Sequence, residues 1–194
     1  MEITDLAAQD RADMASLVAG HGPALNSLMD RHGQSIFRFL FRMLGNEDDA
    51  HDLAQETFVR VFQHCKDFKA DAQFSTWLYT IAGNLARNHH RWRSRHRNLS
   101  LDATTTDGNQ SLADMLPASE LSPSEIATKM ERAKAVRTAV DVLPPDMREA
   151  IVLCEWEELS MNEAAKVMET TAKAVESRLY RARKLLRESL ANWL

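Results

Sequence analysis

Apolar and polar positions follow a helical period along almost the whole chain. Between residues 50 and 62 the apolar side chains recur at three- and four-residue steps, which places them on one face of a helix. No stretch of four to eight residues alternates as a half-buried strand does. The period is interrupted at residues 45–46, 66–73 and 144–145, and Pro145 suits the first turn of a new helix. The pattern predicts an all-α protein.

One segment keeps no period. Residues 99–123 are rich in Thr, Ser, Asp, Gly and Pro and contain few apolar side chains, which predicts a flexible acidic linker. We therefore expect two small helical domains, at residues 1–98 and 124–194, each with a core of its own. We also expect these domains to move independently in the free protein, because the linker lacks the apolar surface to fold alone.

A long helix is predicted from about Ser75 to about Arg93. On a helical wheel its apolar side chains share one face, and the opposite face carries polar groups suited to bases and phosphates. Trp77 is either a core residue or a platform for an unpaired base. The residues of the polar face are Thr76, Thr80, Gly83, Asn84, Arg87 and Arg91.

The C-terminal pattern is a short helix, a tight turn and a longer basic helix. Ser160 and Glu163 have the spacing of a capping box, and Thr171 is placed to cap the last helix. This order is that of a helix-turn-helix, which reads base edges in the major groove. The alternative is a solvated charged face on an ordinary helix. The polar face of the last helix carries Lys173, Ser177, Tyr180, Arg181 and Lys184.

Charge is segregated along the chain, although the formal net charge is only −4. Residues 47–56 hold five acids and no Lys or Arg, whereas residues 84–97 hold five Arg and no acid. Residues 98–125 again hold five acids and no base, and residues 176–187 hold four Arg and one Lys against one Glu. This order predicts separate surfaces for separate partners.

Composition and motifs exclude several classes of protein. No apolar run approaches the roughly 20 residues that cross a bilayer, and no basic-then-apolar export signal begins the chain, so we expect a cytoplasmic protein without a membrane span. Cys65 and Cys154 form no CxxC pair and are expected to be reduced thiols. The seven His residues form no HExxH and have no paired ligand spacing. We therefore expect no metal, no cofactor and no enzymatic activity.

Four stretches together resemble the extracytoplasmic-function (ECF) group of bacterial RNA polymerase sigma factors, within the sigma-70 family. "FRFLFRMLGNEDDAHDLAQETFVRVF" (37–62) is similar to the segment that binds core polymerase. "FSTWLYTIAGNLARNHHRWRSR" (74–95) is similar to the segment that melts and reads the −10 element. "LPPDMREAIVL" (143–153) resembles the start of the second domain, and "LSMNEAAKVMETTAKAVESRLYRARKLLR" (159–187) resembles the helix-turn-helix that reads the −35 element.

The resemblance implies partners and the residues that bind them. Core RNA polymerase, through its β and β′ subunits, is expected to contact Asp49, Asp52, Gln55 and Glu56. Promoter DNA at the −10 element is expected to contact Lys69, Phe74, Thr80, Asn84, Arg87, Asn88, Arg91 and Arg93. At the −35 element the expected residues are Lys173, Ser177, Arg178, Tyr180, Arg181 and Lys184. An anti-sigma factor is the expected regulator.

Some features of the chain leave alternatives open. The linker either mimics RNA on its path out of the polymerase or is a plain spacer. Glu169 stands in a turn where the family usually has Gly, Glu176 where it has a basic or small polar residue, and Gly83 where a larger residue is common. The alternative function is a helix-turn-helix regulator that does not bind core polymerase. The acidic helix and the Thr/Asn/Arg stripe argue against that regulator.

Overall fold

Every regular element in the described part of this computed structural model is helical, which confirms the predicted all-α class. The structure describes residues 2–69, 72–96, 123–191 and 193. Of the predicted linker, residues 99–123, all but residue 123 lie outside the described residues. The elements are α1 (Glu2–Val18), α2 (Ala24–Leu44), α3 (Glu47–Gln63), the 3-10 helix η1 (Cys65–Asp67), α4 (Phe74–His96), α5 (Pro123–Asp141), α6 (Pro145–Ile151), the π-helical turn η4 (Val152–Trp156), α7 (Met161–Val167) and α8 (Ala172–Ser189).

The break between α2 and α3 is built from two adjacent residues. Gly45 adopts a left-handed conformation with φ 70°, and its N–H donates to the Phe41 carbonyl at 2.9 Å, which ends α2. The side chain of Asn46 accepts from the Asp49 N–H at 2.8 Å and caps α3. The interruption predicted at residues 45–46 is therefore confirmed.

The predicted caps of the C-terminal helices are also present. The Ser160 hydroxyl accepts from the Glu163 N–H at 3.3 Å, and the Glu163 carboxylate accepts from the Ser160 N–H at 2.9 Å. The Thr171 hydroxyl accepts from the Ala174 N–H at 3.2 Å, and Pro145 occupies the first turn of α6. These residues fix where α6, α7 and α8 begin.

Helix α1 is an element that the hydrophobic pattern did not identify. Its later part is buried through Met14 and Leu17. Its buried Asp10 accepts hydrogen bonds from Arg31 at 3.0 Å and from His32 at 2.9 Å, both on α2. Helix α1 is thus held to α2 by ion pairs as well as by a short apolar edge.

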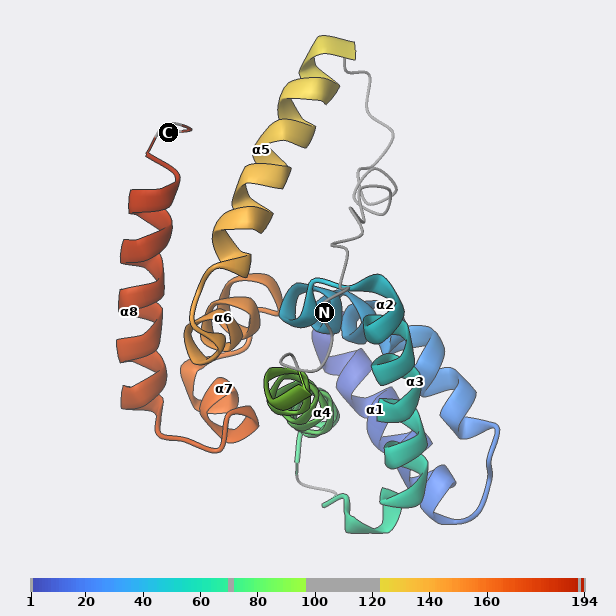
Figure 1. Cartoon of the computed structure of the whole chain (residues 1–194). Helices are drawn as coiled ribbons and strands as arrows, with labels where there is room; N and C mark the ends of the chain where they lie inside the picture. The colour runs from blue at the N-terminus through green and yellow to red at the C-terminus, as the bar shows by residue number, and fades with distance from the viewer. Residues whose placement is uncertain (1, 70–71, 97–122, 192, 194) are drawn as a thin grey trace.

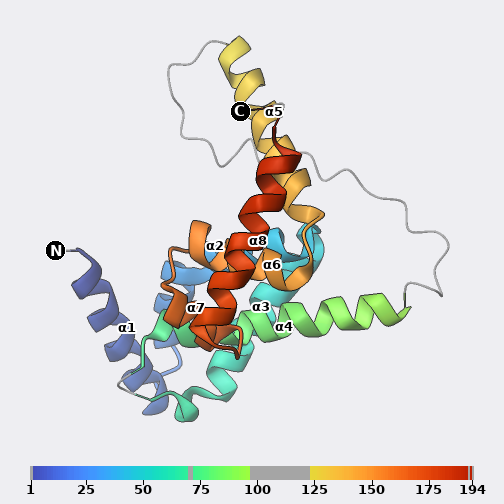
Figure 2. The same ribbon diagram turned by 90° about the vertical axis from the view of Figure 1, so that its left-hand side faces the viewer.

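The two halves of the molecule meet along α4. Figure 1 shows α1–α3 on one side of α4 and α6–α8 on the other, and Figure 2 shows the C-terminal end of α4 projecting beyond both. Buried residues of both halves, such as Phe39 and Leu153, belong to one continuous hydrophobic cluster. The expectation that each half has a core of its own is therefore not met in this structure.

Candidate nucleic-acid interface

The start of α4 is held in an aromatic group. The ring centroids of Phe68 and Trp77 are 5.2 Å apart, and those of Phe74 and Trp77 are 6.2 Å apart. Phe74 is only 3% exposed, so this structure does not support its expected contact with −10 bases. Trp77 packs against the same core, which favours the core interpretation over base stacking. Lys69 is exposed, whereas residues 70–71 of the predicted reading loop lie outside the described residues.

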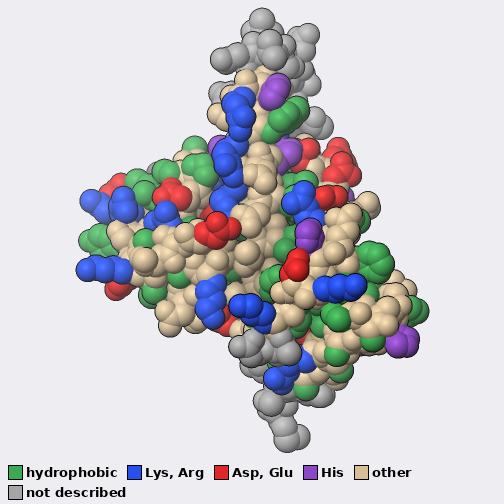
Figure 3. All heavy atoms as spheres, turned by 90° about the horizontal axis from the view of Figure 1, so that it is seen from below, with side chains coloured by type: hydrophobic (Ala, Val, Ile, Leu, Met, Phe, Trp, Pro, Cys, Tyr) green, Lys and Arg blue, Asp and Glu red, His purple; other side chains and the backbone are tan. Residues whose placement is uncertain are grey.

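The projecting end of α4 is basic and exposed. Seen from below, Lys and Arg side chains follow one another along it toward the top of Figure 3. Arg91 donates to the Asn88 side-chain oxygen at 2.6 Å, and both residues are exposed. Trp92 is 57% exposed and stacks on His96 with the ring centroids 4.6 Å apart. This end presents cations, an amide and an aromatic face to solvent, a combination suited to single-stranded nucleic acid.

The acidic and basic runs are not fully separated in space. Asp49 lies 3.3 Å from Arg93 and 3.5 Å from His89, so one residue expected at the polymerase pairs with one expected at the promoter. The sequence predicted separate surfaces because α3 and the end of α4 are distant along the chain. Packing of α3 against α4 brings them together. Asp52 and Gln55 are exposed on α3, and the Glu56 carboxylate accepts from Arg60 at 2.8 Å.

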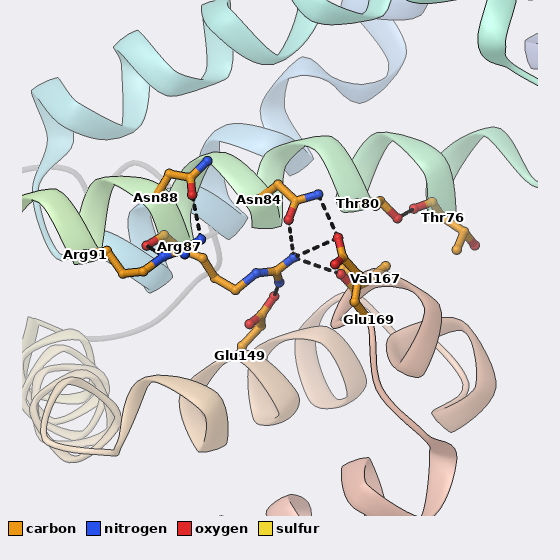
Figure 4. A network of polar contacts seen from close by, with 9 residues as sticks. All are labelled: Thr76, Thr80, Asn84, Arg87, Asn88, Arg91, Glu149, Val167 and Glu169. Carbon is orange, nitrogen blue, oxygen red and sulfur yellow. Dashed lines mark hydrogen bonds and ion pairs between the residues drawn. The ribbon is translucent and has the colours of Figure 1, made fainter.

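The middle of α4 faces the helix-turn-helix and is only partly exposed to solvent. Figure 4 shows Asn84 and Arg87 pointing at α6 and at the turn after α7. Arg87 donates to the Glu149 carboxylate, and its second nitrogen donates to the Val167 carbonyl at 3.2 Å. Asn84 donates to the Glu169 carboxylate at 3.1 Å and accepts from Arg87 at 2.6 Å. Sequence reasoning missed these partners, because they lie 62 or more residues from Asn84 and Arg87 along the chain.

Thr80 is also engaged within α4. Its hydroxyl donates to the Thr76 carbonyl at 2.8 Å, one turn earlier, and Thr76 itself is buried. The polar stripe predicted on the wheel therefore has a buried beginning, a covered middle and an exposed end. Among the described residues of this helix, those from Asn88 onward are the most exposed part of its polar side.

The electrostatics of the covered middle are dominated by a buried acid. The side chain of Glu149 is 3% exposed, and burial raises its pKa to about 7 although Arg87 and Arg178 act in the opposite direction. Asp146, on the same helix, adds to the upward shift. The Arg87–Glu149 pair is thus stabilised by charge and hydrogen bonding but carries a large desolvation cost.

A second polar junction joins the two halves around Glu157. Its carboxylate accepts from the Tyr79 hydroxyl at 2.5 Å and from Arg42 at 3.1 Å. Burial raises the pKa of Glu157 and that of Tyr79. The Arg42 guanidinium also lies 5.4 Å from the centre of the Trp156 ring. As at Glu149, an acid of the C-terminal half meets donors of the N-terminal half.

The last helix has the two faces that its sequence predicts. Val175, Leu179 and Ala182 are buried, and Tyr180 is 72% exposed on the other side. Arg178 donates to Asp146 at 3.1 Å and is half-buried, so this residue is less available to DNA than its neighbours. The exposed polar face is completed by Lys173, Ser177, Arg181 and Lys184.

Two features are absent from the described part of the chain. No helix there is long and apolar enough to pass through a bilayer. No group of three or more His, Cys, Asp or Glu side chains there is arranged to hold a metal ion.

Comparison with known proteins decides the family. Sigma-70 region 2 matches residues 28–96, and sigma-70 region 4 matches residues 133–186. The chain is 30% identical over 171 residues to the ECF RNA polymerase sigma factor SigW of Bacillus subtilis, covering 88% of this chain and 91% of SigW. The chain belongs to the ECF sigma factors of the sigma-70 family. As a sigma factor it serves promoter-specific initiation by RNA polymerase, and sigma factors are not enzymes.

Other relatives agree with this assignment. The sigma factor is 34% identical over 169 residues to the ECF sigma factor SigE of Mycolicibacterium smegmatis, with 87% of this chain matched. It spans 62% of the length of that relative. Its structure is similar to that of CnrH, solved in complex with the cytosolic domain of CnrY, with a TM-score of 0.68 and 28% identity. That match covers 95% of this chain and 98% of CnrH.

Proposed function

We propose that this sigma factor, acting in the cytoplasm, reads the −10 element through α4 and the −35 element through α8. Residues 1–98 form the first promoter-reading domain, residues 99–123 connect it, and residues 124–194 form the second. The observation that carries the proposal is the exposed face of α8, where cations and hydroxyls lie opposite a buried apolar face. Such a face fits the major groove, where side chains read base edges and phosphates.

At the −10 element, some residues of α4 contact bases and others contact phosphates. Asn84 and Asn88 contact exposed bases, because a side-chain amide both donates and accepts hydrogen bonds. Arg87, Arg91 and Arg93 hold phosphates, which supplies affinity without sequence information. Lys69 and Thr80 remain proposed contacts with the −10 element beside this surface. Phe74 is left out, because its ring is buried.

At the −35 element the exposed residues of α8 make the contacts. Lys173, Arg181 and Lys184 supply positive charge, and the hydroxyls of Ser177 and Tyr180 supply further hydrogen bonds. Arg178 contributes once it leaves Asp146. The Glu169 and Glu176 side chains carry negative charge beside this surface, which disfavours phosphates close to them.

Core polymerase binds the acidic side of α3. Asp52 and Gln55 are exposed there and are the strongest contacts in this proposal, whereas Asp49 and Glu56 first exchange their present partners, Arg93 and Arg60. Asp52→Arg with Gln55→Ala should lower the affinity of the full chain for core polymerase at least tenfold, with helical content unchanged.

The matched control for this test lies on α2. Asp30→Arg with Asn26→Ala changes an Asp and a side-chain amide, as in the test, at exposed positions that have no proposed contact with polymerase. Affinity for core polymerase should stay within about twofold of the unchanged chain. Full binding by the α3 variant, or equal losses in both variants, would refute the assignment of polymerase binding to α3.

An anti-sigma factor is the proposed regulator, and an apolar groove with a basic rim suits it. The groove, of about 480 Å³, lies between α2, α5 and η4, and Phe41, Val136 and Trp156 line it. Arg38 and Arg132 contribute positive charge at its edge. An amphipathic helix with acidic residues beside its apolar face fits this groove by shape and by charge. CnrH, a similar structure, is likewise bound to a second protein, CnrY.

The groove assignment is tested with a single acid. Val136→Glu places a carboxylate where an acidic helix would dock, and should abolish inhibition by the anti-sigma factor while polymerase binding persists. Val142→Glu adds the same charge at an exposed position outside the groove and should leave inhibition intact. Equal inhibition of both variants would place the regulator elsewhere.

A further inference from the structure

The covered middle of α4 points to a self-closing state. We propose that in the free chain the helix-turn-helix domain latches onto the −10 face of α4, so that the sigma factor must open before it can read −10 bases. This inference rests on the proposed role of α4 at the −10 element. The latch consists of Gly83 on α4, Glu149 on α6 and Glu169 in the turn after α7.

The latch occupies the groups that the promoter needs. Two carboxylates and one backbone carbonyl accept hydrogen bonds from Asn84 and Arg87. Phosphate oxygens and base edges offer acceptors of the same kind. Arg87 uses both terminal nitrogens inside the molecule, one toward Glu149 and one toward the Val167 carbonyl. Because the same N–H groups cannot serve both sets of acceptors, closing and −10 binding exclude one another.

Gly83 allows the two halves to approach so closely. A Cβ at this position would lie 3.0 Å from the Glu149 carboxylate oxygen and 3.5 Å from a Val167 methyl. A glycine inside a helix weakens that helix, so its place in α4 calls for a compensating contact. The sequence alone placed Gly83 on the face of the helix suited to bases and phosphates. In the structure it is the helix-turn-helix domain that approaches it.

Glu169 supplies the other side of the latch at a backbone position that favours glycine. Its φ is 52°, in the left-handed region, yet the residue is a glutamate whose carboxylate accepts from Asn84 at 3.1 Å. The same carboxylate lies 3.9 Å from an Arg87 nitrogen. A glycine there would relieve the backbone and lose both contacts.

Glu158 provides a natural comparison for Glu169. It is exposed, with a left-handed φ of 54°. The structure shows no hydrogen bond or ion pair from its carboxylate to any described residue. Gly33 likewise matches Gly83, because it lies inside α2 and a Cβ there would meet nothing within 4 Å.

The test uses the full chain, free and in holoenzyme, with two latch variants and two controls. Glu169→Ala removes the acceptor of Asn84, and Gly83→Leu wedges the domains apart while strengthening α4. Glu158→Ala and Gly33→Leu make the same chemical changes outside the latch. The probe is the single-stranded non-template −10 segment of a promoter that the holoenzyme transcribes. Binding is measured by fluorescence anisotropy, and the radius of gyration is measured by small-angle X-ray scattering.

Both latch variants should bind the probe at least fivefold more tightly than the unchanged free chain and show a larger radius of gyration. Both controls should match the unchanged chain, and in holoenzyme the Glu169→Ala gain should vanish because polymerase already holds the domains apart. Unchanged affinity in both latch variants would overturn the latch, whether or not the chain expands. Failure of the proposed −10 role has a different signature: Asn84→Ala in holoenzyme would leave the preference among −10 sequences unaltered.

Discussion

The Glu149 carboxylate makes the contact between the two halves of the molecule dependent on pH. It faces Arg87 of α4 and Arg178 of α8, with Asp146 on its own helix. Its pKa is raised to about 7 in the closed structure, from an ordinary value of 4.5. Withdrawal of α4 would let water reach the carboxylate and return its pKa toward that ordinary value.

The sign of the pH dependence follows from linkage. A carboxylate whose pKa is higher in the closed state takes up a proton on closing, so closing is favoured as the pH falls and is weakened as it rises through 7. Between pH 8 and pH 6 the ratio of closed to open chains should increase by about tenfold. Small-angle X-ray scattering of the free chain at the two pH values should show a smaller radius of gyration at pH 6.

The control for this prediction is Glu149→Gln. A glutamine keeps an oxygen that accepts from Arg87 but does not titrate. Its radius of gyration should therefore be the same at pH 6 and pH 8. A pH response that survives this substitution would belong to another group, such as Glu157, whose pKa is also raised by burial at the second junction of the two halves.

Substitutions of single residue types on α4 can separate contacts with bases from contacts with phosphates. Arg91→Ala with Arg93→Ala should weaken open-complex formation on all promoters alike, because phosphates carry no sequence information. Each lost phosphate contact should lower the salt-dependence slope by roughly one unit. Asn84→Ala should instead change the ranking among −10 variants. An arginine pair that altered the ranking and left the salt slope unchanged would reverse this assignment.

At the scale of elements, the sequence predicted those features of the helices that depend on residues a few positions apart. The Ser160–Glu163 box and the Thr171 cap were predicted because a cap needs only residues three positions apart. The burial of Phe74 was not predicted, because one of its partner rings, that of His32, comes from another helix. The Arg87–Glu149 pair, separated by 62 residues, leaves no periodic trace in the sequence.

The cap of the recognition helix offers a stability test. Thr171→Ala removes the hydroxyl that accepts from the Ala174 N–H and should destabilise the protein by about 1 kcal/mol. For a chain of this size that corresponds to a lower melting temperature by roughly 2–4 °C. Thr170→Ala, one residue earlier and outside the cap position, should change the melting temperature by less than half as much. Equal shifts would mean that the hydroxyl of Thr171 does not stabilise α8.

At the scale of the whole molecule, the sequence predicted two domains and the structure joins them. The composition of residues 99–123 still predicts the first proteolytic cuts, because the segment is polar and rich in Ser, Thr and Asp. The shared hydrophobic cluster adds a second expectation: the two fragments should stay associated after cleavage. Size-exclusion chromatography should show one complex at pH 6. Fragments that separate at once would show that the domains are independent when free, as the linker composition alone suggests.

The central claim is that this chain directs RNA polymerase to promoters that carry both a −10 and a −35 element. The most direct measurement maps the 5′ ends of transcripts induced by overproducing the chain. The account predicts start sites that share two upstream elements at a fixed spacing, and loss of all of them when Asp52→Arg with Gln55→Ala is overproduced instead. Induced transcripts that share only one element, or that persist with that variant, would contradict the claim and favour a helix-turn-helix regulator.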